Sequence, residues 1–438
     1  MDVFDRIAAK KKKVDLSTKR VVVFDRGPWL PVALQLGRDF GNVDYYLTEE
    51  ETHPSFMLDQ IGKGYEEIHL VDDFWTAVHK ADMVVFTGVY NGNFQKEVIR
   101  QGIPCFSAMG SEVLETVKSK MYKMLSKSGL PVPTYRGKPI WEEGYVTGVD
   151  NAQRMLKDEE NKIIKCDYYR GDMETKKYLN AFLSSPWFDE IRTRIGVGHD
   201  QFKLIIEDLI KSKCEGGYDT PNLDGEIPDY VSIGYEAKDQ LYANRIVKKL
   251  PKIMQDVHDR MKPAFKHLGF QAWQSTEILF DEKGNPHVID LTHRFGRPPS
   301  ELLMEQYTSF PLNVWDLGHG IMPTMEYEDE YGFYIALWSE VGLKHWIPVQ
   351  FPKEIERYVK LINSKKVANG YYVLPKDKDG DIGCVIGTGK TLKEAKDTAF
   401  ERLKMIQCDE LEHGDELAFA EIEKRIAVGK RDFNIDFG

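Results

Sequence analysis

The fold is decided by the stretch Thr276-Glu277-Ile278, followed after a short turn by Val288-Ile289-Asp290-Leu291-Thr292-His293-Arg294-Phe295-Gly296. The pattern predicts two strands, 274–280 and 287–291. Residues 281–285 between them read Asp-Glu-Lys-Gly-Asn, a composition typical of a hairpin turn. Because side chains alternate between the faces of a strand, Asp290, Thr292 and Arg294 should point the same way, and the hairpin can bring Glu277 alongside Asp290.

Two carboxylates and an arginine on one face suit bound magnesium and a polyphosphate. Magnesium takes oxygen ligands, typically one or two carboxylates plus phosphate oxygens. The arginine can stabilise charge that develops on a transferring phosphoryl group. For any one of these residues alone, a solvent-facing strand with a structural salt bridge is the better explanation. The whole set on paired strands, after a lysine-bearing strand and a glycine loop, favours phosphate chemistry.

Basic residues further upstream are candidate phosphate contacts. The predicted strand 162–165 ends in Lys165, whose charged tip can reach a nucleotide phosphate. The loop Arg170-Gly171-Asp172 could close over phosphates through its backbone N–H groups, although most short glycine loops are only turns. Lys118, on a helix predicted over 111–128, is a second candidate, although most lysines on helix surfaces are simply solvated.

Two acidic positions complete the predicted nucleotide site. The stretch from Glu207 to Ile210 follows the predicted strand 202–206, where the chain could hinge against an adenine ring. Glu215, just after the break, could accept hydrogen bonds from ribose hydroxyls.

The remaining pattern predicts three units. In residues 1–110, strands at 21–24, 43–47, 68–71 and 83–86 alternate with helical stretches such as 32–40, which predicts a parallel sheet with ligands near the strand C-termini. The second unit, 111–325, contains the hairpin, a lid over about 130–210 and a helix over 252–267. The third, 326–438, contains a strand at 382–386 and a helix at 391–406, capped by Thr391 with Glu394 three residues on. The charged final stretch predicts a surface helix and a tail.

Composition narrows the class of protein. A length of 438 residues predicts two to four domains. The net charge of −11 argues against an extended nucleic-acid-binding surface but allows a local basic pocket for a nucleotide. The run Lys10 to Lys13 is the one basic block, interpreted as a solvated tail or, less favoured, a phosphate-contacting arm. No apolar stretch is long enough to span a bilayer, no secretion signal is recognised, and five scattered cysteines fit reduced thiols, so we expect a cytoplasmic protein that does not bind membranes.

The order of these pieces resembles the ATP-grasp superfamily, and within it the phosphoribosylamine–glycine ligases. Leu114-Glu115-Thr116-Val117-Lys118 through Leu130-Pro131 is similar to that family's Leu-Glu-x-Ser-Lys to Ile-Pro segment. Asp290-Leu291-Thr292-His293-Arg294-Phe295-Gly296 resembles its Glu-x-Asn-x-Arg-Phe-Gly segment. Gly387 with Thr391-Leu392-Lys393-Glu394-Ala395 and Ala399-Phe400 is similar to its C-terminal Gly-x-Thr-Leu-x-Glu-Ala to Ala-Tyr segment.

The resemblance implies a fold and a reaction. The fold is of the α/β class: an N-terminal parallel-sheet domain, an α+β ATP-grasp domain with a central antiparallel sheet, and a small C-terminal α+β domain. The reaction activates a small-molecule carboxylate with ATP and magnesium (or manganese) and lets an amine attack the acyl phosphate, which in this family belongs to purine biosynthesis. Lys118 and Lys165 would contact ATP phosphates, Glu277 and Asp290 would hold the metal, and Arg294 would be the catalytic residue. A monomer or homodimer is expected.

Three departures from the family pattern leave the substrates open. Thr292 stands where the family's metal-binding asparagine would be, and is a weaker oxygen ligand. Arg297-Pro298-Pro299-Ser300-Glu301 replaces Asp-Pro-Glu, which allows a more anionic substrate or only sequence drift. Asp25-Arg26-Gly27-Pro28-Trp29 stands in place of the N-terminal Gly-Gly-Arg-Glu-His loop. The alternatives are a ligase that joins an amino acid to another amine (a peptide, polyamine or modified nucleotide) and a non-catalytic nucleotide-binding protein; a nicotinamide oxidoreductase lacks its glycine motif after Phe24.

Overall fold

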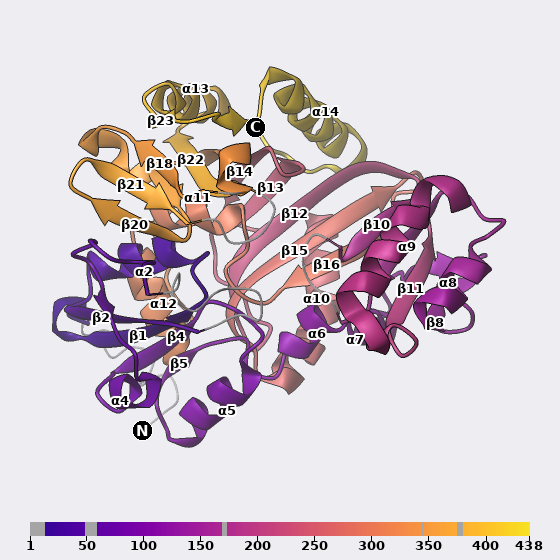
Figure 1. Cartoon of the computed structure of the whole chain (residues 1–438), viewed down its shortest axis with the longest axis horizontal. Coiled ribbons are helices and arrows are strands. Elements are labelled where there is room, and N and C mark those ends of the chain that lie inside the picture. The colour runs from indigo at the N-terminus through magenta and orange to yellow at the C-terminus, as the bar shows by residue number, and fades with distance from the viewer. Residues whose placement is uncertain (1–13, 49–58, 169–172, 344, 375–379) are drawn as a thin grey trace.

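The computed structural model of the chain describes residues 14–48, 59–168, 173–343, 345–374 and 380–438 (Figure 1). It contains a parallel sheet, a four-stranded lid sheet, a nine-stranded sheet and a second four-stranded sheet near the C-terminus. None of the helices in these ranges is long and apolar enough to cross a membrane. The predicted α/β class, with a parallel sheet and a large antiparallel sheet, is confirmed.

The N-terminal part is a five-stranded parallel sheet in the order β3-β2-β1-β4-β5. Its elements, after the short helix η1 (Leu16–Thr18), are β1 (Arg20–Asp25), α2 (Leu30–Gly37), β2 (Asn42–Leu47), β3 (His69–Leu70), α4 (Phe74–Val78), β4 (Met83–Phe86), α5 (Gly92–Arg100) and β5 (Cys105–Phe106). Every residue of β4 is buried, as expected for a parallel strand covered on both faces. The C-terminal end of β1 is closed by its own residue Asp25, which accepts hydrogen bonds from Gly27 N, Trp29 N, Tyr45 Oη and Thr87 Oγ1.

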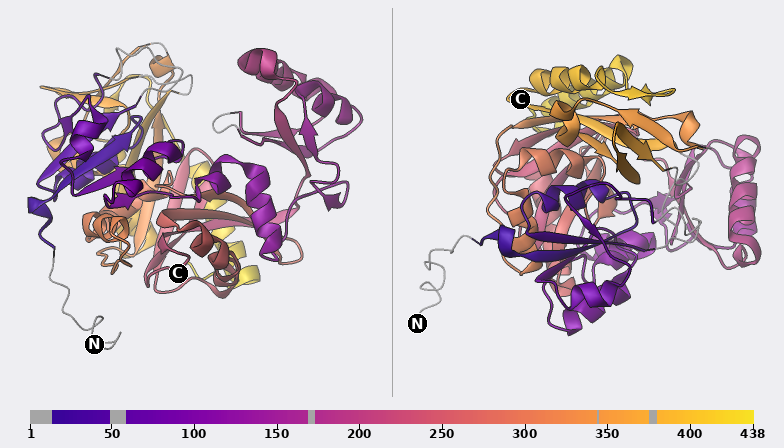
Figure 2. Two further views of the ribbon diagram at one scale, coloured as in Figure 1. Left: turned by 90° about the horizontal axis from the view of Figure 1, so that it is seen from below. Right: turned by 60° about the vertical axis from the view of Figure 1, so that its left-hand side comes forward.

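The lid is a compact unit that projects from the rest of the molecule (Figure 2). Its sheet, in the order β10-β9-β11-β8, is antiparallel. The elements are β8 (Tyr145–Thr147), α8 (Val149–Met155), β9 (Lys162–Cys166), β10 (Thr175–Tyr178), α9 (Ala181–Ile195), η2 (Gly196–Gly198) and β11 (Lys203–Asp208). A separate apolar cluster that includes Tyr178 and Phe188 forms its core.

Two helices and a small ribbon connect the parallel sheet to the lid. They are α6 (Glu112–Thr116), α7 (Lys118–Lys127), β6 (Thr134–Tyr135) and β7 (Lys138–Pro139). The single helix predicted over 111–128 is therefore wrong in one respect, because the backbone is extended at Val117 and divides it. The break makes Lys118 the first residue of α7 and directs it toward the lid, where its backbone N–H donates to Asp167 O.

The nine-stranded sheet runs in the order β16-β15-β12-β13-β14-β17-β22-β19, with β24 also paired to β17. Its strands are β12 (Ser212–Leu223), β13 (Val231–Ala237), β14 (Leu241–Val247), β15 (Gln271–Asp281), β16 (Pro286–Thr292), β17 (Tyr331–Trp338), β19 (Val359–Leu361), β22 (Asp381–Gly389) and β24 (Glu412–His413). The helices α10 (Lys252–Leu268), α11 (Pro299–Gln306), α12 (Phe310–Gly318), α13 (Leu392–Leu403) and α14 (Glu416–Phe433) accompany it. The predicted hairpin is confirmed as β15–β16.

The C-terminal part adds a small sheet in the order β20-β21-β18-β23. It comprises β18 (Ile347–Gln350), β20 (Ser364–Val367), β21 (Gly370–Val373) and β23 (Gln407–Cys408), with η3 (Glu340–Leu343) and η4 (Lys353–Tyr358) nearby in the chain. Pairing of β14 with β17 carries the large sheet across the predicted boundary at 325/326, and the three domain limits stay predictions. The predicted surface tail is wrong, because Ile435 and Phe437 after α14 are buried.

Candidate active site

One face of the large sheet carries the predicted metal pair. Neighbouring strands place Gly217 of β12 opposite Glu277 of β15, and Glu277 opposite Asp290 of β16. Directly opposed residues on antiparallel strands share a face and approach closely. A side chain at Gly217 would place its Cβ 2.7 Å from the Thr276 carbonyl oxygen, so glycine allows β12 to approach β15 closely. The pairing of β15 with β16 therefore presents the two carboxylates side by side on one face of the sheet.

A bulge in β16 orients Asp290. The register shifts between Glu277 and Ile278, whose partners are Asp290 and Val288, so Ile289 is an extra residue. Val288 stays in the apolar core while Asp290 turns to the other face, which a regular alternation would not allow. Thr292 has the same half-buried character as Asp290 and is opposed by Ser275. The structure thus places Thr292 on the same face, and its role as a metal ligand stays a prediction.

The site has an excess of negative charge that a cation would relieve. Burial and the neighbouring Asp290 raise the pKa of Glu277 well above its usual range. Burial also raises the pKa of Glu236, and both Glu236 and Glu215 act on Glu277 in the same direction. Partial desolvation opposes the charge of Lys238, yet Glu277 and Glu236 raise its pKa. Oxygen ligands with unfavourable mutual repulsion are the donor set that a magnesium ion fits.

Lys118 connects the metal pair to the lid. Its side chain is only 3% exposed, and its Nζ lies 2.5 Å from Asp290 Oδ1 and 2.9 Å from Glu174 Oε1. Asp167 of the lid fixes the start of α7 by accepting from Ser119 N and Ser119 Oγ. The Lys118 ammonium already contacts one oxygen of Asp290. A phosphate that binds Lys118, or a metal that binds Asp290, would therefore have to displace this ion pair.

Lys165 belongs to a second buried polar group inside the lid junction. Its Nζ donates to Tyr122 Oη at 2.7 Å and lies 3.3 Å from Glu207 Oε2. The Tyr122 hydroxyl in turn donates to Glu207 Oε1 at 2.5 Å. Burial and the charge of Glu207 raise the pKa of Tyr122, so the hydroxyl stays protonated. Lys165 and Glu207, which the sequence predicts as separate nucleotide contacts, therefore lie next to each other in the structure.

The other predicted nucleotide contacts lie at the junction between lid and large sheet. Ile210 is half-buried in the short connection from β11 to β12. Glu215, near the start of β12, accepts from Arg425 Nη1 of α14 at 2.9 Å. Arg170 and Gly171 lie outside the described residues.

Arg294 is anchored by a glutamate that sequence reasoning did not assign. Its Nε donates to Glu115 Oε1 at 2.9 Å, and Glu115 Oε2 accepts from His293 N at 2.6 Å. Glu115 is 1% exposed and comes from α6, far away in sequence. Its place in the Leu-Glu-x-x-Lys match was the only available signal. Arg297, in contrast, is paired with Glu301 and Asp381 at 2.7 Å each, so the added positive charge is compensated within the protein.

Six further residues of the site were not predicted from the sequence. They are Gly217, Glu236, Lys238, Tyr122, Glu174 and Arg425. Each belongs to an ordinary-looking strand, helix or turn and becomes part of the site only through long-range strand pairing or packing.

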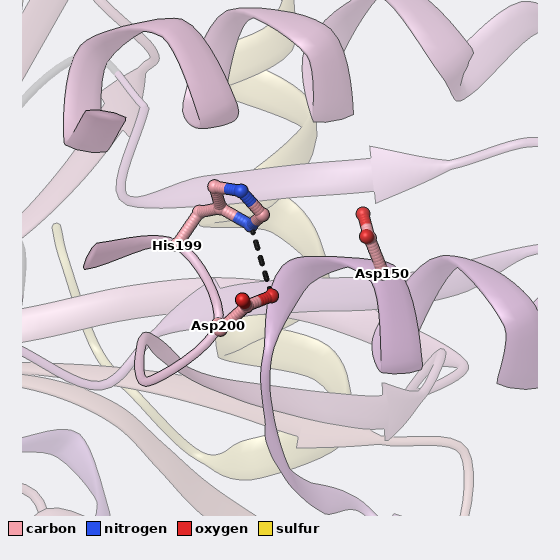
Figure 3. Close-up of side chains that lie close together, drawn as sticks. All are labelled: Asp150, His199 and Asp200. Atoms are coloured by element: carbon pink, nitrogen blue, oxygen red, sulfur yellow. Dashed lines mark ion pairs between the residues drawn. The ribbon is translucent and has the colours of Figure 1, made fainter. Parts of the chain in front are cut away.

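A second group of possible metal-ligating side chains lies on the lid (Figure 3). Asp150, His199 and Asp200 are the only three metal-ligand side chains grouped within 4.8 Å in the described part of the chain. His199 Nδ1 is 3.3 Å from Asp200 Oδ1, and Asp150 accepts from Arg192 Nε at 2.7 Å. Both aspartates are exposed, which is ordinary for a solvated surface.

Comparison with known proteins places this geometry in a known fold. No family model matches the chain, and no curated protein is significantly similar in sequence. Among solved structures, a phosphoribosylamine–glycine ligase from Thermotoga maritima matches with a TM-score of 0.63 and 13% identity, over 90% of this chain and 99% of that chain. The biotin carboxylase domain of 2-oxoglutarate carboxylase from Hydrogenobacter thermophilus, solved with MgADP, gives 0.66 and 13%, over 96% and 99%. N5-carboxyaminoimidazole ribonucleotide synthetase from T. maritima gives 0.56 and 13%, over 89% and 99%.

These solved structures, each 13% identical to this chain, show its fold. The chain has the ATP-grasp fold, as the motif order predicted. The match covers almost the whole length of the phosphoribosylamine–glycine ligase.

Proposed function

We propose that this protein is an ATP- and magnesium-dependent carboxylate–amine ligase. The observation that carries the proposal is the opposed pair Glu277 and Asp290, with the buried amine of Lys118 at the same point. The fold shared with three ATP-dependent ligases supports it. The enzyme would act on small molecules, and we keep the cytoplasm as its expected location.

The side chains divide the chemistry among them. Glu277 and Asp290 would hold magnesium, which when bound neutralises phosphate charge and aligns the transferring group. Lys118 and Lys165 would orient ATP phosphates from the two sides of the junction between sheet and lid. Arg294, held by Glu115, would stabilise the charge on the phosphoryl group as it passes to the carboxylate. The amine then attacks the acyl phosphate, the C–N bond forms, and phosphate leaves.

Glycine and phosphoribosylamine are the first substrate pair to test. The resemblance of the motifs and the near-complete overlap with a phosphoribosylamine–glycine ligase support this choice. Thr292 and the 25–29 loop depart from that family, so another acid–amine pair is the main alternative. Turnover only with a different pair would refute the choice of glycine and phosphoribosylamine, but it would still support a carboxylate–amine ligase.

ADP release with candidate acid–amine pairs tests the reaction class. We expect the wild type to form ADP, and Asp290→Asn to lose at least about a hundredfold in rate because the metal loses a carboxylate. Glu282→Gln, an exposed carboxylate in the turn of the same hairpin, is the matched control and should keep full activity. ATP binding by the wild type without ADP formation across the pairs would instead indicate a non-catalytic nucleotide-binding protein.

A further inference from the structure

A cluster of cations surrounds a single buried carboxylate that does not belong to the metal pair. Glu305 of α11 has a side chain that is 1% exposed. Lys360 Nζ of β19 lies 2.5 Å from its Oε1, Arg357 Nε of η4 donates to its Oε2 at 2.7 Å, and Arg38 Nη1, just after α2, lies 3.4 Å from Oε1. Three positive charges therefore converge on one negative charge.

Further acids lie near this group: burial lowers the pKa of Arg357, but the charges of Glu305 and Glu328 raise it. Glu356 is taken by Lys366 and Tyr371, at 2.5 Å and 2.7 Å. Glu67 lines the same pocket at its Tyr65 side. Burial lowers the pKa of Lys360, and the charge of Arg38 lowers it further despite the contact with Glu305. The side chains of Arg38 and Arg357 are 35% and 52% exposed, so the positive charge that Glu305 does not balance lies where a ligand can reach it, whereas the buried Lys360 is paired with Glu305.

The cations line a small pocket between two parts of the fold. Its wall includes Leu34, Arg38, Phe351, Arg357, Lys360 and Tyr371. The rings of Phe351 and Tyr371 are stacked with centroids 4.7 Å apart, and the Tyr65 ring is stacked with Tyr371 at 6.1 Å, so aromatic rings form one side of the pocket. Glu305 occupies Arg38 through Nη1 and Arg357 through Nε and Nη2. Among the described residues, Arg38 Nε and Nη2 and Arg357 Nη1 have no hydrogen-bond partner, so donors remain available.

We propose that this pocket binds a small molecule through a phosphate group. Paired arginine forks and a lysine match the charge and the several acceptor oxygens of a phosphate better than those of a single carboxylate. The stacked rings would accept an apolar or planar portion of the same molecule. Because α2 covers the N-terminal part, β19 belongs to the large sheet and β21 to the small C-terminal sheet, the bound molecule would tie these parts together; Figure 1 labels α2 and β21. The pocket is separate from the proposed metal and ATP site, since no lining residue belongs to the metal pair or its lysines.

Calorimetric titration with inorganic phosphate and pyrophosphate tests the site. We expect binding to persist in Lys118→Ala, which alters only the proposed ATP site. Binding should weaken by about tenfold or more in Arg357→Gln and in Arg38→Gln, because each removes charge-assisted donors. Arg100→Gln, an exposed arginine paired with Glu97 on α5, is the matched control and should bind as the wild type. Adenosine monophosphate and ribose 5-phosphate, titrated into Lys118→Ala, separate a nucleotide from a sugar phosphate, because only the nucleotide gains from the stacked rings.

Glu305→Gln gives a test with the opposite sign. The change removes the competing carboxylate with little change in shape, so phosphate should bind more tightly than to the wild type. The variant should unfold at a lower temperature, and added phosphate should raise its unfolding midpoint more than that of the wild type. The proposal would be overturned if Lys118→Ala did not bind phosphate, if Arg357→Gln and Arg38→Gln bound it as tightly as the wild type, or if Glu305→Gln did not bind it more tightly. In each case the cluster would be only a structural ion-pair network.

Discussion

Two charged clusters of the molecule differ in the sign of their net charge. Acidic groups outnumber cations in one cluster, and cations outnumber acidic groups in the other. On the large sheet, Glu277, Asp290, Glu236 and Glu215 crowd together with too few cations, and the pKa of Glu277 is raised. Around Glu305, three cations share one carboxylate, and the pKa of Lys360 is lowered. The acidic cluster lies at the junction with the lid, whereas the basic cluster lies between the N-terminal and C-terminal parts. Burial makes the imbalance costly in the acidic cluster, whereas the excess cations of the basic cluster are partly exposed, so a ligand of opposite charge would stabilise each cluster for a different reason.

Removing the lysine of the acidic cluster should have the largest effect. Lys118→Ala is expected to reduce ADP formation on the order of a hundredfold to a thousandfold, because a preorganised phosphate contact is lost. It also leaves Asp290 and Glu174 to repel each other, so the lid should open more readily. Steady-state kinetics measures the rate, and Lys120→Ala, an exposed lysine on the same helix, is the control. Unchanged kinetics in Lys118→Ala would remove the lysine from the proposed site.

Glu115→Gln should separate anchoring of Arg294 from binding of the metal. The amide can still accept from His293 N but no longer pairs with the guanidinium, so we expect a loss of about 1–3 kcal/mol in the free energy of unfolding. Urea denaturation measures this loss, and the rate should fall while magnesium affinity stays close to that of the wild type. A fall in magnesium affinity as large as that of Asp290→Asn would contradict a role through Arg294 alone.

The hairpin shows how much of this site the sequence could predict. Alternation and turn composition are local properties, so they identified β15, β16 and the opposition of Glu277 and Asp290. The bulge at Ile289, the Glu115 anchor and Lys238 depend on contacts between distant segments, for which a single sequence has no signal. The Glu305 cluster joins residues more than 250 positions apart in the chain, at Arg38 and Glu305, and was missed entirely. The roles of the individual site residues stay predictions.

A pH series tests the acidic cluster without any substrate. The pKa of Glu277 is raised on folding, so the folded state binds the proton more tightly and this contribution to stability is present at low pH. It is lost as the pH rises through the raised pKa, and magnesium should restore it most at high pH. Unfolding midpoints with a chelator and with magnesium, at about pH 6 and about pH 9, measure both effects. Glu277→Gln should abolish the difference, and Glu282→Gln should keep it; equal magnesium effects at both pH values would contradict the sign.

The smallest expected effect concerns the pair between Glu215 and Arg425. Both side chains are partly exposed, so Arg425→Gln should change the free energy of unfolding by less than about 1 kcal/mol. The freed carboxylate should nevertheless alter the KM for ATP if Glu215 contacts the ribose as predicted. Arg431→Gln, an exposed arginine of the same helix, is the control. An unchanged KM would place Glu215 outside the nucleotide site.

We expect Glu277 and Asp290 together to hold the metal of a bound nucleotide. A crystal structure with manganese and a non-hydrolysable ATP analogue tests this role most directly, because manganese is located by its anomalous scattering. We expect one or more manganese peaks in contact with both carboxylates and with phosphate oxygens, with Lys118 moved from Asp290 to a phosphate. Manganese bound elsewhere, or a nucleotide that leaves Lys118 on Asp290, would contradict it.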